Sequence, residues 1–138
     1  MRVVIDANVL ISCLIRPHGR TGRIRDHMRG GRFTVLYSRE TLAEFINVIS
    51  RPNLIEKYRI QEQDFRAFRS LILMRGKRIE IKTPVNVCRD PKDNGYLSLA
   101  LDGHADTIVS GDGDLLSLNP FRGIPIIKPA EFLDILAK

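Results

Sequence analysis

Short apolar runs alternate with amphipathic stretches along this chain, and that rhythm predicts β-strands separated by α-helices. The expected strands cover Arg2–Asp6, Phe33–Tyr37, Arg78–Lys82, Thr107–Ser110 and Ile124–Ile127. The expected helical segments are an apolar stretch that reaches Arg16–Pro17, then Thr21–Arg29, Arg39–Ser50, Asn53–Tyr58, Gln61–Arg75, a helix from Asp90–Pro91 through His104, a turn at Asp114–Leu118, and Pro129–Ala137. Parallel neighbours need crossover connections, so this order predicts a parallel five-stranded sheet with helices on both faces.

Residues suited to helix ends support these boundaries. Ser38 stands where an N-cap is needed, and Pro129 suits the first position of the last helix. Gly30–Gly31 and Gly76 follow helical stretches as C-terminal stops. Local chemistry therefore agrees with the hydrophobic pattern about where helices begin and end.

Length and composition limit the number of cores. A chain of 138 residues with 43% hydrophobic composition can bury one core but not two, so residues 1–138 are expected to form a single domain. Asp6 and Asn8 interrupt the apolar start before a signal-peptide core could form, and no run reaches membrane-spanning length. We therefore expect a soluble cytoplasmic protein with no membrane partner. Cys13 and Cys88 lack C-x-x-C spacing and are expected to be reduced core residues.

Carboxylates follow the predicted strands at the end where parallel sheets bind ligands. Asp6 ends the first strand, and Asp112 follows the fourth. Asp90 and Asp93 begin the helix after the third strand, and Glu44 lies in the helix after the second. Four separate crossovers therefore bring acidic side chains toward one edge of the sheet.

Most of these acids, taken singly, also have an ordinary structural explanation. Asp93 could favour a helix N-terminus, Asp112 and Asp114 could be turn residues beside glycines, and Glu44 could lie on a solvated helix face. Asp6 follows three β-branched residues at the end of a buried strand, where a charge requires partners. Clustered carboxylates repel one another, and hard divalent cations such as Mg²⁺ or Mn²⁺ relieve that repulsion. The cluster therefore predicts a metal site suited to phosphodiester hydrolysis.

Four stretches of the chain carry a family resemblance. They are VVIDANVLIS, YSRETLAEFINVISRP, CRDPKDNGYLSLALDGHADTIVSGDGDLLSL and IIKPAEFLDIL. In this order and spacing the chain resembles the PIN-domain nucleases, and more closely the toxin ribonucleases of type II toxin–antitoxin systems within that family. The resemblance implies a PIN-like fold, which is a three-layer α/β/α sandwich around a five-stranded parallel sheet, and endonucleolytic cleavage of RNA.

The resemblance also implies roles for single residues. The four acidic positions of the family, which are catalytic and hold the metal, fall on Asp6, Glu44, Asp93 and Asp112. They are expected to hold one or two Mg²⁺ or Mn²⁺ ions, which generate hydroxide and stabilise the pentavalent phosphate. Asn8 and Ser110 match polar positions that support these ligands, and Asp90 and Asp114 are further acids that could join the set. Gly95 and Ser110 differ from the commoner family residues, but neither difference removes an acid.

Positive charge predicts a polyanionic partner, because the formal net charge is +6. Six arginines crowd positions 16 to 32, and Arg16, Arg20 and Arg23 would share one face of a continuous helix. Pro17 and Gly19 argue against such a helix. We expect these arginines to contact RNA phosphates, and the alternative is a solvated surface or a site for an acidic partner. The resemblance adds a cognate antitoxin protein and a homodimer as expected partners.

Two other classes of function compete with the nuclease hypothesis. A catalytically idle PIN module would bind RNA or a protein partner, but the complete acidic set argues against it. A phosphatase or phospho-receiver would also place an aspartate after its first strand, yet the D-x-D motif of aspartyl phosphatases is absent because the third position is Asn8. The three histidines fall in loops or on helix surfaces and are not expected to be catalytic; they are His18, His27 and His104.

Overall fold

The structure, a computed structural model, describes all residues from 1 to 138 and contains one five-stranded sheet. Its strands are β1 (Arg2–Ile5), β2 (Thr34–Tyr37), β3 (Lys77–Arg78), β4 (Thr107–Val109) and β5 (Ile126–Ile127). The strands lie in the order β3-β2-β1-β4-β5, and every neighbouring pair is parallel. This topology confirms the predicted parallel sheet and places the strand that ends at Asp6 in its centre.

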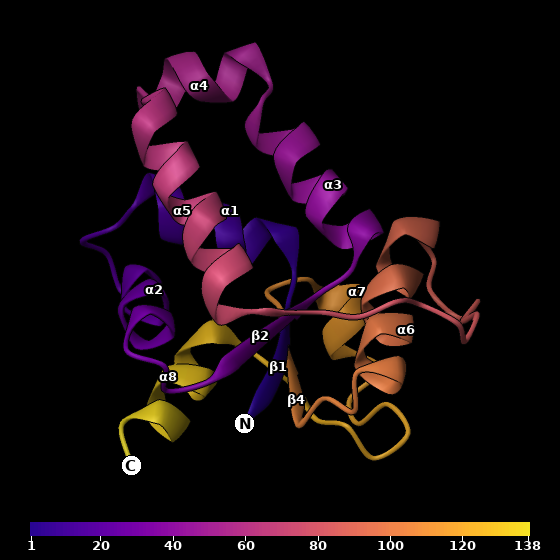
Figure 1. Cartoon of the computed structure of the whole chain (residues 1–138). Helices are drawn as coiled ribbons and strands as arrows, with labels where there is room; N and C mark the ends of the chain where they lie inside the picture. The colour runs from indigo at the N-terminus through magenta and orange to yellow at the C-terminus, as the bar shows by residue number, and fades with distance from the viewer.

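Helices cover both faces of the sheet (Figure 1). They are α1 (Ala7–Ile15), α2 (Gly22–Arg29), α3 (Arg39–Ile49), α4 (Pro52–Tyr58), α5 (Glu62–Arg75), the short 3₁₀ helix η1 (Pro91–Asp93), α6 (Asn94–Asp102), α7 (Gly113–Leu116) and α8 (Pro129–Leu136). Figure 1 shows α2, α5 and α8 on one side of the sheet and α6 and α7 on the other. The result is the predicted three-layer α/β/α sandwich. None of the helices combines the length and apolar character that crossing a membrane requires.

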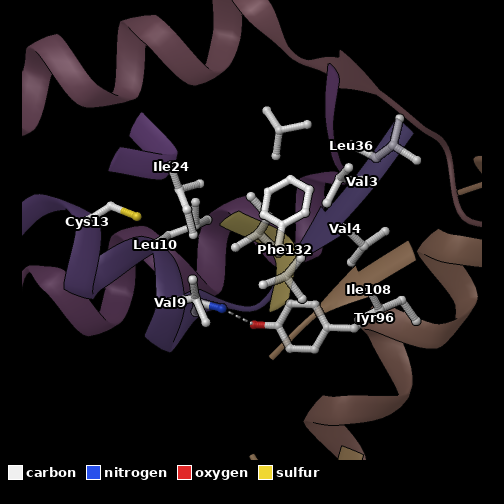
Figure 2. Close-up of a cluster of buried hydrophobic side chains, with 14 of the residues drawn as sticks. Val3, Val4, Val9, Leu10, Cys13, Ile24, Leu36, Tyr96, Ile108 and Phe132 are labelled. Atoms are coloured by element: carbon white, nitrogen blue, oxygen red, sulfur yellow. Dashed lines mark hydrogen bonds between the residues drawn. The ribbon is translucent and has the colours of Figure 1, made fainter. Parts of the chain in front are cut away.

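One buried cluster of 32 hydrophobic residues holds the layers together. Val3 and Val4 of β1 are fully buried at its centre, as expected for a strand covered on both faces (Figure 2). Phe132 anchors α8 to this core, where its ring packs edge to face against the ring of Phe33 at a centroid distance of 5.0 Å. The last helix therefore closes the layer that α2 and α5 begin.

Two helix ends follow the predicted local chemistry. The Ser38 hydroxyl accepts a hydrogen bond from the Thr41 amide, and the Thr41 hydroxyl accepts one from the Ser38 amide, both at 3.0 Å. Gly76 ends α5 where a Cβ atom would lie 2.4 Å from the Ile72 carbonyl oxygen and 2.8 Å from that of Val35. Only glycine lets the chain turn from α5 into β3 at this close approach.

The third strand is shorter than the sequence predicts. The expectation of a strand over Arg78–Lys82 is wrong, because β3 covers Lys77–Arg78 and pairs there with Leu36 and Tyr37. The Ile79 amide still donates to the Tyr37 carbonyl at 2.8 Å. Beyond that point β2 has ended and its chain has entered the cap of α3, so residues after 79 have no strand to pair with.

Two further boundaries differ from expectation. The last strand was expected over Ile124–Ile127 but begins at Ile126, because Ile124 forms an antiparallel bridge with Phe121 instead of pairing with β4. The helix expected to run through His104 is divided into η1 and α6 and stops at Asp102, and His104 adopts a left-handed backbone with φ of 52°.

Candidate active site

Asp6 lies at the junction of the central strand and the first helix. It is 4% exposed, and its Oδ1 caps α1 by accepting a hydrogen bond from the Val9 amide at 2.9 Å. Its Oδ2 accepts a hydrogen bond from the Ser110 hydroxyl. One carboxylate oxygen is therefore held by the first turn of α1, and the other by the residue that directly follows β4.

Ser110 links two acids across the sheet. It is fully buried at the end of β4, where its hydroxyl donates to Asp6 and accepts a hydrogen bond from the Asp112 amide at 3.0 Å. Asp112 in turn caps α7, since its Oδ1 accepts from the Asp114 amide at 3.3 Å. One hydroxyl thus fixes the distance between the carboxylate after β1 and the loop after β4.

Glu44 reaches the same edge of the sheet from the middle of α3. Its Oε2 accepts a hydrogen bond of 2.8 Å from the Tyr96 hydroxyl. That hydroxyl also accepts a hydrogen bond of 3.0 Å from the Ala7 amide, at the first residue of α1. A side chain of α6 therefore connects Glu44 to the helix that begins beside Asp6.

Asp93 lies where η1 meets α6, and Asn94 supports the loop that leads to it. Asn94 is buried, and its Oδ1 accepts hydrogen bonds from the amides of Val87 and Cys88 at 3.0 and 2.9 Å. Asp90 caps η1 by accepting from the Lys92 amide at 3.1 Å. The long connection after β3 is thereby tied to the start of α6, which sets the position of Asp93.

The four principal acids line one small cavity, although they come from four separate segments of the chain. The lining residues are Asp6, Ala7, Asn8, Glu44, Val48, Asp93, Tyr96 and Asp112. The cavity has a volume of about 50 Å³. Because one water needs about 10 to 15 Å³ of such volume, the cavity has room for an ion with a few waters but not for a nucleotide.

Proximity and burial make ionisation of two of these acids less favourable. Burial raises the pKa of Asp6 above its ordinary value, and the nearby Asp112 raises it further, while the Ser110 hydrogen bond opposes the shift. Burial, followed by Asp112, raises the pKa of Asp93 to about 6. Acids that resist ionisation for these reasons become easier to ionise when a cation lies among them.

The donor chemistry of the cavity fits a hard divalent cation. The four acids contribute carboxylates to its lining and Asn8 contributes an amide, and oxygen atoms of these groups are the ligand types that Mg²⁺ and Mn²⁺ prefer. The structure contains no group of three or more His, Cys, Asp or Glu side chains already gathered as a metal-binding cluster. The acids share a cavity wall without converging on one point.

Other residues predicted for the site lie outside the cavity. Asp90 and Asp114 are exposed and do not line it. Arg16, Arg20 and Arg23 are exposed in the segment from the end of α1 to the start of α2. Nine residues of α1, at 1.5 Å each, put Arg16 about 14 Å along the helix axis from its start at the cavity. Ser110 is not part of the lining but contacts Asp6 from behind.

Sequence reasoning missed Tyr96 and Asn94, the two residues of α6 that hold neighbouring parts of the site. Tyr96 falls among apolar residues of an amphipathic stretch, where an aromatic ring is expected to be part of the core. The signal that could have identified both was their polar atoms in a buried segment, because buried hydroxyl and amide groups require hydrogen-bond partners.

Larger depressions lie elsewhere on the molecule. Two of them, of about 400 and 420 Å³, run beside β3 and α3 and share Arg39 and Arg78. Neither includes any of the four principal acids. Size alone therefore does not identify the site, and the small acidic cavity is the candidate on chemical grounds.

Comparison with known proteins gives a consistent result for family and fold. A family model described as PIN domain matches residues 2–114. The protein named Uncharacterized protein MJ1680 from Methanocaldococcus jannaschii is 36% identical over 122 residues, which cover 86% of this chain and 75% of that protein.

Two solved structures share the fold at low sequence identity. The crystal structure of VapBC2 from Rickettsia felis bound to a DNA fragment from their promoter has a TM-score of 0.59 and 14% identity, covering 93% of this chain and 98% of that chain. The crystal structure of PAE2754 from Pyrobaculum aerophilum has a TM-score of 0.60 and 20% identity, covering 99% of this chain and 90% of that chain. Both likenesses show that the sandwich described above is a known arrangement.

Proposed function

Because the chain belongs to the PIN-domain family, we propose that it is a metal-dependent endoribonuclease and the toxin of a type II toxin–antitoxin system. The observation that carries this proposal is the cavity wall that Asp6, Glu44, Asp93 and Asp112 share. A solvated helix face or an isolated turn would explain one acid, but not four acids from four chain segments around one cavity.

The same four carboxylates would hold Mg²⁺ or Mn²⁺. A bound divalent cation supplies Lewis-acid chemistry for phosphodiester hydrolysis, since it activates water and offsets the charge that develops on the phosphate. Asp90 and Asp114 are exposed outside the cavity, so we assign them no direct contact with the cation. No side chain of the protein has to act as the nucleophile.

The remaining polar residues prepare the carboxylates. Ser110 and the Val9 amide orient both oxygens of Asp6 before any cation arrives, so its binding does not have to order that side chain. Asn8 is exposed on the cavity wall, where its amide nitrogen can donate to a phosphate oxygen. A donor at this position would stabilise charge that develops on the phosphate during the reaction.

The substrate is RNA that lies across the mouth of the cavity. A volume of about 50 Å³ admits an ion and waters but not a base, so only a backbone phosphate would approach the carboxylates. The net charge of +6 favours a polyanion over other substrates. Arg16, Arg20 and Arg23 would then contact phosphates some distance along the strand.

We further propose a protein partner. The solved structure of VapBC2 from Rickettsia felis is bound to a DNA fragment from their promoter, and an antitoxin is the partner that a toxin ribonuclease of this kind requires. A homodimer in the cytoplasm is the assembly that the family resemblance favours.

The decisive experiment is cleavage of a 5′-labelled RNA by the purified chain with Mg²⁺ or Mn²⁺, with EDTA, and with the Asp112→Asn variant. We expect cleavage that EDTA abolishes and that Asp112→Asn reduces by orders of magnitude. Asp134→Asn is the matched control, because Asp134 is exposed on α8, which contributes no residue to the cavity lining. EDTA-insensitive cleavage would contradict the mechanism, and RNA binding without cleavage by the wild type would instead indicate the catalytically idle module.

A further inference from the structure

The Tyr96 hydroxyl is a buried polar group that bridges two parts of the acidic cavity. Tyr96 is 3% exposed. Its hydroxyl accepts from the Ala7 amide at 3.0 Å and donates to Glu44 Oε2 at 2.8 Å. Figure 2 shows the ring among the buried hydrophobic side chains with the hydroxyl at the end of a hydrogen bond.

The direction of both hydrogen bonds follows from their chemistry. The Ala7 amide can only donate, so the phenol oxygen must accept there, and the phenol proton is left to point at the Glu44 carboxylate. The hydroxyl is therefore the donor to Glu44, and no second acceptor competes for its proton.

The bridge connects three of the four acid-bearing elements. Ala7 directly follows Asp6, Tyr96 lies three residues after Asp93, and Glu44 stands on α3. Glu44 is a long side chain with several rotatable bonds, and the Tyr96 hydroxyl is its only side-chain hydrogen-bond partner in the structure. Without this contact, a cation that binds to Glu44 would first have to fix the rotamer of that side chain, at a cost in conformational entropy.

We propose that Tyr96 is a positioning residue, which holds the Glu44 carboxylate and the start of α1 where cation binding requires them. This inference rests on the proposed metal site. Loss of a partner that orients a metal ligand typically costs 10- to 100-fold in metal affinity. Removing the Tyr96 hydroxyl should therefore weaken Mg²⁺ binding by about tenfold or more, although that hydroxyl would not itself touch the cation.

The first test compares Tyr96→Phe with Tyr37→Phe. Both substitutions remove one hydroxyl and keep the ring, but the half-buried Tyr37 makes no side-chain hydrogen bond. Isothermal calorimetry should show about tenfold weaker Mg²⁺ binding for Tyr96→Phe and no change beyond twofold for Tyr37→Phe. Cleavage by Tyr96→Phe should recover as Mg²⁺ is raised, while the KM for RNA stays constant because Tyr96 is buried.

The second test needs no substitution at Tyr96, so it stands if Tyr96→Phe fails to fold. The chain has three tyrosines and no tryptophan. In the double variant Tyr37→Phe, Tyr58→Phe, Tyr96 is therefore the only source of tyrosine fluorescence. Tyrosine emission depends on the acceptor of the hydroxyl proton, so Mg²⁺ should change it with the same midpoint that calorimetry gives.

Several results would overturn the inference. Equal Mg²⁺ affinity in Tyr96→Phe and Tyr37→Phe would do so, as would tyrosine emission that stays constant while calorimetry records Mg²⁺ binding. Absence of Mg²⁺ and Mn²⁺ binding to the wild type would also remove its basis. Mg²⁺ binding that depends on Tyr96 in a protein that cleaves no RNA would instead refute the proposed function and leave the inference intact.

Discussion

Two substitutions at Asp6 separate its structural contribution from its proposed catalytic one. Asp6→Asn keeps an oxygen that can accept from the Val9 amide, so the cap of α1 survives while the charge is lost. Asp6→Ala removes the cap, the partner of the Ser110 hydroxyl and the charge together. Metal binding and cleavage depend on the charge, so both variants should lack them, but only Asp6→Ala should be clearly less stable.

The magnitudes follow from these contacts. Loss of an N-cap costs about 1 kcal/mol, and leaving the buried Ser110 hydroxyl without its acceptor costs about 1 kcal/mol more. At roughly 3 to 4 °C per kcal/mol for a chain of this size, Asp6→Ala should lower the melting temperature of the metal-free protein by about 7 °C. Asp6→Asn should change stability by less than about 1 kcal/mol, because it keeps the cap and the amide nitrogen that replaces Oδ2 can donate to the second lone pair of the Ser110 oxygen.

The assay is thermal unfolding in EDTA and in Mg²⁺, with cleavage of labelled RNA measured in parallel. A cation at 100 times its dissociation constant stabilises the wild type by about 2.7 kcal/mol. Neither Asp6 variant should show that gain, and both should lose cleavage by orders of magnitude. The exposed Asp134→Asn should behave as the wild type in every measurement.

Equal instability of Asp6→Asn and Asp6→Ala in EDTA would refute the structural role, because the cap would then not be what the aspartate contributes. A stable Asp6→Asn that retains the Mg²⁺-induced rise in melting temperature would refute the metal role. That result would put the cation outside the cavity.

Three further predictions follow from other residues. The raised pKa of Asp93, about 6 against an ordinary 3.8, means that the metal-free native state binds more protons than the unfolded state. As the pH rises from 3.8 to about 6, the free energy of unfolding of the wild type should therefore fall relative to that of Asp93→Asn, as measured with urea in EDTA. The same pH dependence in both proteins would refute this prediction. Arg20→Ala with Arg23→Ala should make the log-log salt dependence of RNA affinity, measured in Ca²⁺, shallower by about 0.7 per lost phosphate contact. An unchanged slope would place the RNA elsewhere. Hydrogen bonds from Thr83 lower the pKa of Asp102, so Asp102→Asn should reduce stability at neutral pH, with a difference that shrinks as the pH falls below about 4. Equal unfolding curves at both pH values would show that this contact is not stabilising.

Much of the fold can be predicted from the sequence because its signals are local. The apolar run before Asp6 is short, β-branched and without a polar residue to face solvent, which is typical of a strand covered on both faces. Ser38 caps the start of α3 through contacts with Thr41, and Gly76 ends α5 beside the carbonyl of Ile72, so both signals act within four residues. The parallel order also predicts a common edge for Asp6 and Asp112, because the chain must cross over between strands that point the same way.

Tertiary structure alone decided which polar groups meet. The length of β3 depends on where β2 ends, and nothing within Arg78–Lys82 records that point. Asp90 and Asp114 resemble the other acids in sequence, yet they are exposed and lie outside the cavity. The bond between Tyr96 and Glu44 spans 52 residues. A helical pattern shows which side chains are buried but not what they face, because the facing group comes from another element whose position the packing of the whole core determines.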